Sequence, residues 1–294
     1  MKFIGCESEF DEANIVLFGV AFDATSTYRK GSAKGPGAIR KESFGIETYS
    51  PYQDKDLADI KVFDAGDIEV DTKKLIPKIA EEALSMLEKT EAMTEQILWP
   101  GKFPMMLGGE HLVTLGAFRA IAKRHPNVCI VHFDAHTDLR DEWEGNPNNH
   151  STVIRRCFDT IVEHDKKKNN KGKKRIFQFG IRSGEKEEFE FAKNNTVLVK
   201  NNFKDIDKIL RKIGKRPVYL TIDLDVLDPS EMGGTGTPEA GGVRFLELLS
   251  AVRKVFKLNV VGCDMTELSP PFDTNGSSTA LACKLLRELL LLVK

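Results

Sequence analysis

The sequence has no apolar run long enough to cross a membrane and no excess of either charge sign. A bilayer requires roughly 20 consecutive apolar residues, and no segment of the 294 residues approaches that length. The 43 basic and 44 acidic side chains give a formal net charge of -1. A nucleic-acid or membrane-surface binder usually carries a basic excess, so neither class of partner is expected. Glu7 and Glu9 precede any apolar stretch, and the first residues therefore do not resemble a secretory signal.

Cysteine is scarce. The chain has five cysteines, scattered without a CxxC pair, in 294 residues. Disulfide scaffolds are short and rich in cysteine, so this class is excluded. We expect the thiols to behave as small apolar side chains in or near the core, in a protein of the reducing cytoplasm.

Only two segments have a biased composition. Residues 166–175 (KKKNNKGKKR) could bind an anion, but a solvated surface loop is the simpler interpretation because the whole chain is not basic. Residues 233–242 (GGTGTPEAGG) have neither the GKS or GKT ending of a phosphate-binding loop nor GxGxxG spacing. A nucleotide site is therefore not predicted there.

Short apolar runs alternate with helical patterns along the chain. The runs are nearly continuous, as expected for parallel strands that are covered on both faces. Helical spacing of apolar residues occurs at 73–98, 243–256 and 274–293. Length alone allows one domain or two, but no linker interrupts the alternation, so we predict one domain over residues 1–294. We expect an α/β fold with a three-layer, doubly wound and mostly parallel eight-stranded sheet and helices on both faces, its strands at 15–21, 60–64, 103–107, 128–133, 175–180, 196–199, 217–223 and 258–264.

Three groups of histidine and carboxylate residues follow predicted strands. They are GGEH at 108–111, DAHTD at 134–138 and DLD at 223–225. In an open α/β sheet the ligand crevice forms at the carboxyl ends of the strands, so all three groups point to one place. Residues i and i+2 share a face of an extended backbone, which allows the acids of each group to converge. DAHTD alone could be a solvated turn, but its coincidence with the other two groups favours a metal site.

The type of metal follows from the ligands. Four aspartates packed together repel one another unless a cation neutralises them. Oxygen and imidazole ligands without thiolate suit Mn²⁺ better than structural zinc. Six ligands are too many for one tetrahedral ion, so we expect two ions.

Motifs along nearly the whole chain resemble the ureohydrolases, the family of arginase, agmatinase and formiminoglutamase, with agmatinase the most similar member. Besides the first two groups above, the matching segments are TIDLDVLDP at 221–229, TSTYRKGSAKGPGAIR at 25–40, GTGTPEAGG at 234–242 and DMTELSPPFD at 264–273. Leu112 and Ser151 depart from the family pattern, where Ser and Gly are common. The resemblance implies an arginase/deacetylase-like fold.

The resemblance also implies roles for individual residues. His150, in NNHST, matches the family's proton-shuttle histidine, and Glu267, in TELSP, matches the carboxylate that binds the guanidinium group. His125, His132 and His164 match no role and are interpreted as structural or solvated. The implied ligands of two Mn²⁺ ions per chain are His111, Asp134, Asp138 and Asp223 around the first ion or the bridge, and His136 and Asp225 at the second, with the carboxylates partly shared and Asp138 also counted as catalytic.

The implied activity is that of a binuclear manganese hydrolase that cleaves a guanidinium substrate, with agmatine converted to putrescine and urea in polyamine biosynthesis. Family members usually assemble as homo-oligomers, trimers or hexamers. Arginine, guanidinobutyrate and formiminoglutamate remain alternative substrates. A single-metal deacetylase would not need the DLD group, and a non-catalytic metal-binding scaffold would not need both His150 and Glu267.

The segment 139–150 bears on the choice of substrate. In the family it contacts the end of the substrate that is distant from the guanidinium. Here it carries Asp141, Glu142 and Glu144 against a single Arg140, so we expect it to repel the carboxylate of arginine and to attract an amine. Arg140 could reverse this preference if it turns toward the substrate.

Overall fold

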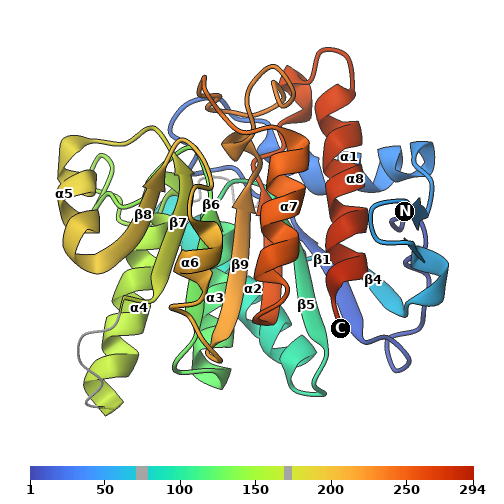
Figure 1. Ribbon diagram of the computed structural model, residues 1–294, viewed down its shortest axis with the longest axis horizontal. Helices are drawn as coiled ribbons and strands as arrows, with labels where there is room; N and C mark the ends of the chain where they lie inside the picture. Colours follow the sequence, from blue (N-terminus) through green and yellow to red (C-terminus); the bar gives the residue numbers. More distant parts are fainter. Residues whose placement is uncertain (71–78, 169–173) are drawn as a thin grey trace.

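The central element is an eight-stranded sheet in which every strand pair is parallel (Figure 1). The computed structural model describes residues 1–70, 79–168 and 174–294. All eight predicted strands are confirmed within three residues at each end. In sheet order they are β4 (Val62–Asp67), β1 (Ile15–Val20), β5 (Phe103–Gly108), β10 (Asn259–Thr266), β9 (Pro217–Asp223), β6 (Cys129–Phe133), β7 (Ile176–Ile181) and β8 (Thr196–Lys200).

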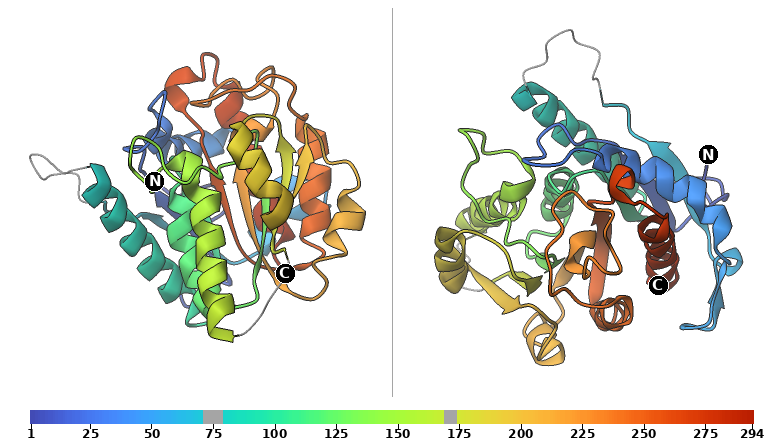
Figure 2. Two further views of the ribbon diagram at one scale, coloured as in Figure 1. Left: turned by 90° about the vertical axis from the view of Figure 1, so that its left-hand side faces the viewer. Right: turned by 90° about the horizontal axis from the view of Figure 1, so that it is seen from above.

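Helices cover both faces of the sheet, as predicted (Figure 2). One face carries α1 (Gly35–Glu42), α6 (Ile206–Leu210), α7 (Phe245–Val255) and α8 (Ser277–Leu292). The other carries α2 (Ile79–Leu98), α3 (Val113–Arg124) and α4 (Val153–Lys168), with α5 (Lys186–Asn195) beside β8. A small antiparallel pair, β2 (Tyr49–Ser50) and β3 (Lys55–Asp56), lies outside the main sheet. Residues 73–78 of the predicted helix 73–98 and residues 169–173 of the lysine-rich segment lie outside the described residues.

The continuous apolar runs arise because both faces of each strand are buried. In β1, Ile15 and Leu17 belong to the core under α1 and α8, whereas Val16 and Phe18 belong to the core under α2 and α3. Alternate side chains of a strand point to opposite faces, so burial on both sides requires apolar residues at every position. The five cysteines are free and buried, as the sequence predicts. No helix among the described residues is long and apolar enough to span a membrane.

Candidate metal centre and active site

Four side chains surround one point at the carboxyl ends of the central strands. His111 follows β5, Asp134 and Asp138 follow β6, and Asp223 ends β9. His111 Nδ1 lies 3.2 Å from Asp134 Oδ2, 3.0 Å from Asp138 Oδ2 and 3.4 Å from Asp223 Oδ2. The other ring nitrogen, Nε2, lies 2.8 Å from the Thr221 hydroxyl. When Nε2 donates to Thr221, the Nδ1 lone pair faces three carboxylates, which is the arrangement of a ligand set around a cation.

A second group lies on the other side of Asp134. His136 Nδ1 is 3.0 Å from Asp225 Oδ2 and 3.4 Å from Asp134 Oδ1. Asp134 therefore directs one oxygen toward each group. Asp138 lies with the first group and is absent from the second. The strands that supply the two groups and Glu267 are β5, β10, β9 and β6, which are consecutive in the sheet. The three motifs and Glu267 therefore converge, although 156 residues separate His111 from Glu267.

Burial and the neighbouring charges shift the pKa values of these histidines and aspartates. Burial, followed by the charges of Asp225 and Asp134, raises the pKa of Asp223 well above its usual value. Burial opposes the charged form of His111 and of His136, but hydrogen bonds and charges from the neighbouring aspartates outweigh it and raise both pKa values. A divalent cation relieves both conflicts, because it neutralises the carboxylates and takes the place of the imidazole protons. The donors, oxygen and imidazole without thiolate, fit Mn²⁺.

His150 and Glu267 meet beside the first group. His150 Nδ1 lies 3.3 Å from Glu267 Oε1, which also accepts a hydrogen bond of 2.9 Å from the backbone N–H of His111. His150 Nε2 lies 2.7 Å from the Thr27 hydroxyl. Burial opposes charge on His150, but the hydrogen bond and charge of Glu267, followed by the charge of Glu110, raise its pKa to about 9. The backbone N–H of Thr27 donates to Nε2 at 3.0 Å, so the proton that the ring holds at neutral pH lies on Nδ1, beside the carboxylate that is implied to bind the guanidinium.

The backbone at the site is unusual in two ways. Asp138 (φ 52°) and Glu267 (φ 67°) both adopt the left-handed conformation, which is uncommon for residues other than glycine and clusters at functional sites. Gly109 is required by close approach, since a Cβ atom there would lie 2.0 Å from the carbonyl oxygen of Phe22. The same oxygen accepts a hydrogen bond of 2.8 Å from the N–H of Glu110, so the turn that places His111 packs directly against the Phe22 backbone.

The ligand groups open into a groove of about 290 Å³ that contains His150 in its wall. Arg140 and Trp143 line it together with Glu185 and Glu188, at the start of α5. Arg140 Nη1 lies 3.0 Å from Glu185 Oε1, and Nε lies 3.7 Å from Glu188 Oε2. The guanidinium also stacks over Trp143, 4.5 Å from the ring centroid. Arg140 faces the groove, but two carboxylates already neutralise it.

The expectation that Asp141, Glu142 and Glu144 set the charge around the distal end of the substrate does not match the lining of the groove. None of the three lines the groove. Asp141 instead pairs with Arg156 of α4 at 2.6 Å, and its side chain is 72% exposed. Besides Asp138 and Asp223 of the ligand groups, the acids that line the groove are Glu185 and Glu188 at the start of α5, a segment for which the sequence gives no signal of function.

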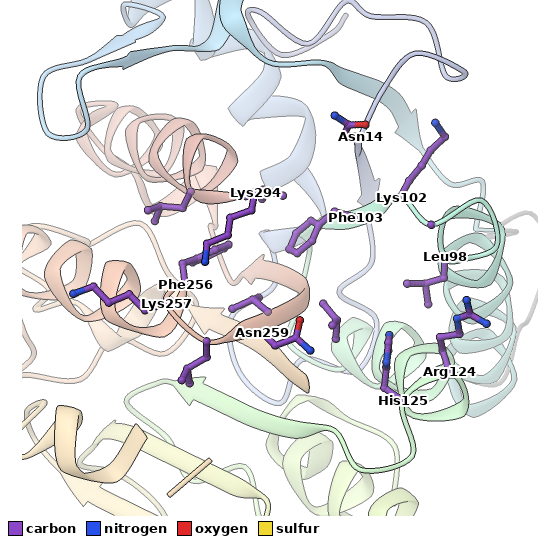
Figure 3. A pocket seen from close by; sticks show the side chains of 16 residues that line it. Asn14, Leu98, Lys102, Phe103, Arg124, His125, Phe256, Lys257, Asn259 and Lys294 are labelled. Carbon is purple, nitrogen blue, oxygen red and sulfur yellow. The ribbon is translucent and has the colours of Figure 1, made fainter. Parts of the chain in front are cut away.

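A more voluminous groove, of about 860 Å³, lies at the opposite end of the strands, where β5 and β10 begin (Figure 3). The helices α2, α3, α7 and α8 end around it. Unpaired carbonyl groups at helix carboxyl termini attract cations, which accounts for the basic side chains in this groove. No carboxylate side chain of the described residues lines it, so it offers none to a metal ion or a guanidinium group; the basic side chains are Lys102, Arg124, His125, Lys257 and Lys294.

Two residues without a prior role shape the loops of the site. Arg182 donates to the backbone carbonyls of Asp225 (2.6 Å) and Glu239 (2.9 Å), which fixes the segment that follows β9. Asp228 accepts hydrogen bonds of 3.0 Å from the N–H groups of Ser230 and Gly242. A hydrogen bond from the Ser230 side chain, followed by these backbone bonds, lowers the pKa of Asp228 to about 2. The third aspartate of the segment 221–229 is therefore a turn residue that joins this segment to the glycine-rich loop.

Comparison with known proteins agrees with this geometry. Residues 13–292 match the model of the arginase family. The chain belongs to the arginase family. Over 293 residues this arginase-family chain is 43% identical to the agmatinase of Bacillus subtilis (strain 168), with 98% of this chain and 95% of the relative covered. It is 33% identical to the guanidinobutyrase of Pseudomonas aeruginosa, with 96% of this chain and 87% of the relative covered.

The solved agmatine ureohydrolase of Thermoplasma volcanium superposes with a TM-score of 0.85 at 32% identity, with 99% of this chain and 93% of that chain covered. The resemblance that the motifs carry, and the fold that it implies, are confirmed.

Proposed function

We propose that this protein is a binuclear manganese hydrolase that converts agmatine to putrescine and urea in polyamine biosynthesis. It would act as a single cytoplasmic domain of residues 1–294 in a homo-oligomer. The observation that carries the proposal is the placement of the His150–Glu267 pair directly beside two histidine–aspartate groups that share Asp134. The relatives named agmatinase or agmatine ureohydrolase support the choice of substrate.

The residues divide the work as follows. His111, Asp134, Asp138 and Asp223 would hold one ion, and His136 and Asp225 would hold the second with Asp134. Two bound divalent ions supply a water activated for attack on the guanidinium carbon. Every other step belongs to the chain itself.

Glu267 would bind the cationic guanidinium. Its Oε1 is already held by the N–H of His111 at 2.9 Å, so the carboxylate is oriented before the substrate arrives. His150, whose pKa is raised to about 9, would deliver a proton to the departing amine. An amine leaves poorly as an anion, so proton transfer at this step accelerates the reaction.

The distal end of the substrate would lie near Arg140. Because Glu185 and Glu188 both contact this arginine, the three side chains together carry one excess negative charge. That charge favours the ammonium group of agmatine over a carboxylate. The sequence argument predicts the same preference for an amine, but from the acids of the segment 139–150.

An assay with Mn²⁺ that measures urea from agmatine, arginine and guanidinobutyrate, and formamide from formiminoglutamate, tests the proposal. We expect kcat/KM for agmatine to exceed that for arginine by at least about tenfold, or ~1.4 kcal/mol. Guanidinobutyrate is the second candidate, because a substrate carboxylate could displace Glu185 from Arg140. A higher kcat/KM for guanidinobutyrate would favour this alternative, and no hydrolysis of any of the four would overturn the proposal.

A further inference from the structure

We propose that His132 positions Asp134, the carboxylate shared by the two ligand groups, and that Gln178 fixes the tautomer in which it does so. The inference rests on the binuclear centre proposed above. It concerns a residue to which the family motifs give no role.

His132 is fully buried in β6, two residues before Asp134 and on the same face of the strand. Its Nε2 atom lies 2.7 Å from Asp134 Oδ2. This is the oxygen that faces His111 Nδ1 at 3.2 Å. The other oxygen, Oδ1, accepts from the N–H of His136. Both oxygens of Asp134 are therefore held by the protein.

The tautomer of His132 follows from its second partner. Gln178 Nε2 donates to the carbonyl oxygen of Thr137 at 2.8 Å, which identifies that atom of the amide as the nitrogen. The same nitrogen lies 3.2 Å from His132 Nδ1. Since an amide N–H faces Nδ1, Nδ1 accepts, and the ring proton lies on Nε2. His132 is thus a hydrogen-bond donor to Asp134.

Thr137, whose carbonyl group orients Gln178, is itself part of the site. Thr137 stands between His136 and Asp138, and its hydroxyl donates to Glu188 at 2.5 Å. The carbonyl that orients Gln178 is therefore fixed by the same loop that carries two of the ligands. An Asp134 carboxylate that could rotate would lose alignment with one group or the other, so the fixed donor favours binding of both ions.

A direct role of His132 as a ligand is the competing interpretation, because it lies within ligand distance of the first group. Both ring nitrogens are already engaged, however, one by Gln178 and one by Asp134. The two roles differ in what a side-chain amide can replace. The Nε2 amide of glutamine can donate to Asp134 much as the imidazole does, whereas as a ligand glutamine would have to offer its oxygen in place of the imidazole nitrogen.

Calorimetric titration of the metal-free protein with Mn²⁺ tests the proposal. We expect His132→Leu to weaken Mn²⁺ binding by about 10-fold to 100-fold, the usual effect of removing a group that orients a ligand. His132→Gln should recover most of the affinity. His125→Leu, the same substitution at the distant groove, should bind as wild type. Thermal unfolding of each metal-free variant shows whether the fold is retained.

If His132→Leu does not fold, Gln178→Leu replaces it. Without the Gln178 amide, the ring proton of His132 is no longer confined to Nε2. This variant should therefore also weaken Mn²⁺ binding, although Gln178 contacts no ligand side chain. Wild-type affinity in either folded leucine variant would overturn the proposal. So would complete loss of one ion per chain in His132→Leu that glutamine does not restore, since His132 would then be a ligand. If wild type itself bound no Mn²⁺, the binuclear centre would fail and this inference with it.

Discussion

The Glu185 carboxylate offers a direct test of how the groove distinguishes substrates. It contacts Arg140 at 3.0 Å and is 54% exposed. Glu185→Gln removes one negative charge and releases Arg140 from one of its two partners. We expect the variant to accept guanidinobutyrate better and agmatine less well.

The magnitude follows from the exposure. Because more than half of the Glu185 side chain is in solvent, the dielectric constant of water applies, and unit charges at about 6 Å interact by ~0.7 kcal/mol. The variant loses this attraction for the ammonium of agmatine and loses the same repulsion for a carboxylate. The ratio of the two kcat/KM values should therefore change by ~1.4 kcal/mol, or about tenfold.

The assay is urea release at low ionic strength, with Glu187→Gln as the matched control. Glu187 lies on the same helix but does not line the groove. The change in ratio should shrink as salt is added, because exposed charges are screened. An equal change of ratio in both variants would refute the reasoning, since it would reflect the net charge of α5 instead of contact with the substrate.

Three further predictions concern the site itself. Asp134→Ala and Asp223→Ala should each remove metal and activity together, whereas wild type should hold about two Mn²⁺ ions per chain by elemental analysis; full activity in a metal-free preparation would contradict this. His150→Asn should keep its metal but lower kcat by about 10²-fold to 10⁴-fold. In wild type kcat should fall above about pH 9, where the raised pKa of His150 lets it lose its proton, and this alkaline fall should vanish in the variant; loss of metal instead would make His150 a ligand. Gly109→Ala should lower the midpoint of thermal unfolding and the occupancy of the metal site, because its Cβ would meet the carbonyl of Phe22; a variant with wild-type stability would show that the turn can shift.

The sequence predicts the positions of the metal-type residues well because local rules determine them. Asp134 and His136 follow a buried strand at a spacing of two, and parallel strands bring their carboxyl ends to one edge. The identity of the neighbouring strands was not predictable from local pattern, since β5 and β6 are separated in the sheet by β10 and β9, which come much later in the chain. Because β10 lies between β5 and β6, Glu267 comes to lie between the GGEH motif at 108–111 and the DAHTD motif at 134–138.

Local pattern fails where a side chain chooses among distant partners. Arg140 and Asp141 are adjacent in sequence, yet one turns to Glu185 of α5 and the other to Arg156 of α4. The sequence argument predicted an excess of negative charge at the groove, and this sign is found. The carboxylates that supply it, however, belong to Glu185 and Glu188 and not to the loop 139–150. His132 shows the same limit, because its role depends on the amide of Gln178 in the neighbouring strand β7.

The candidate ligands and the residues around the distal end of the substrate lie on different parts of the fold. This difference suggests why one metal centre can serve several guanidino substrates. The ligands and Glu267 follow the four central strands, where the backbone on both sides is paired in the sheet and cannot move without disturbing the core. Arg140, Trp143 and Glu185 come from a loop and a helix start, where substitution changes few buried contacts. A change from amine to carboxylate recognition therefore requires only a shift of charge around Arg140. The chemistry at the strand ends can stay the same, and relatives with different substrates should differ most in these two segments.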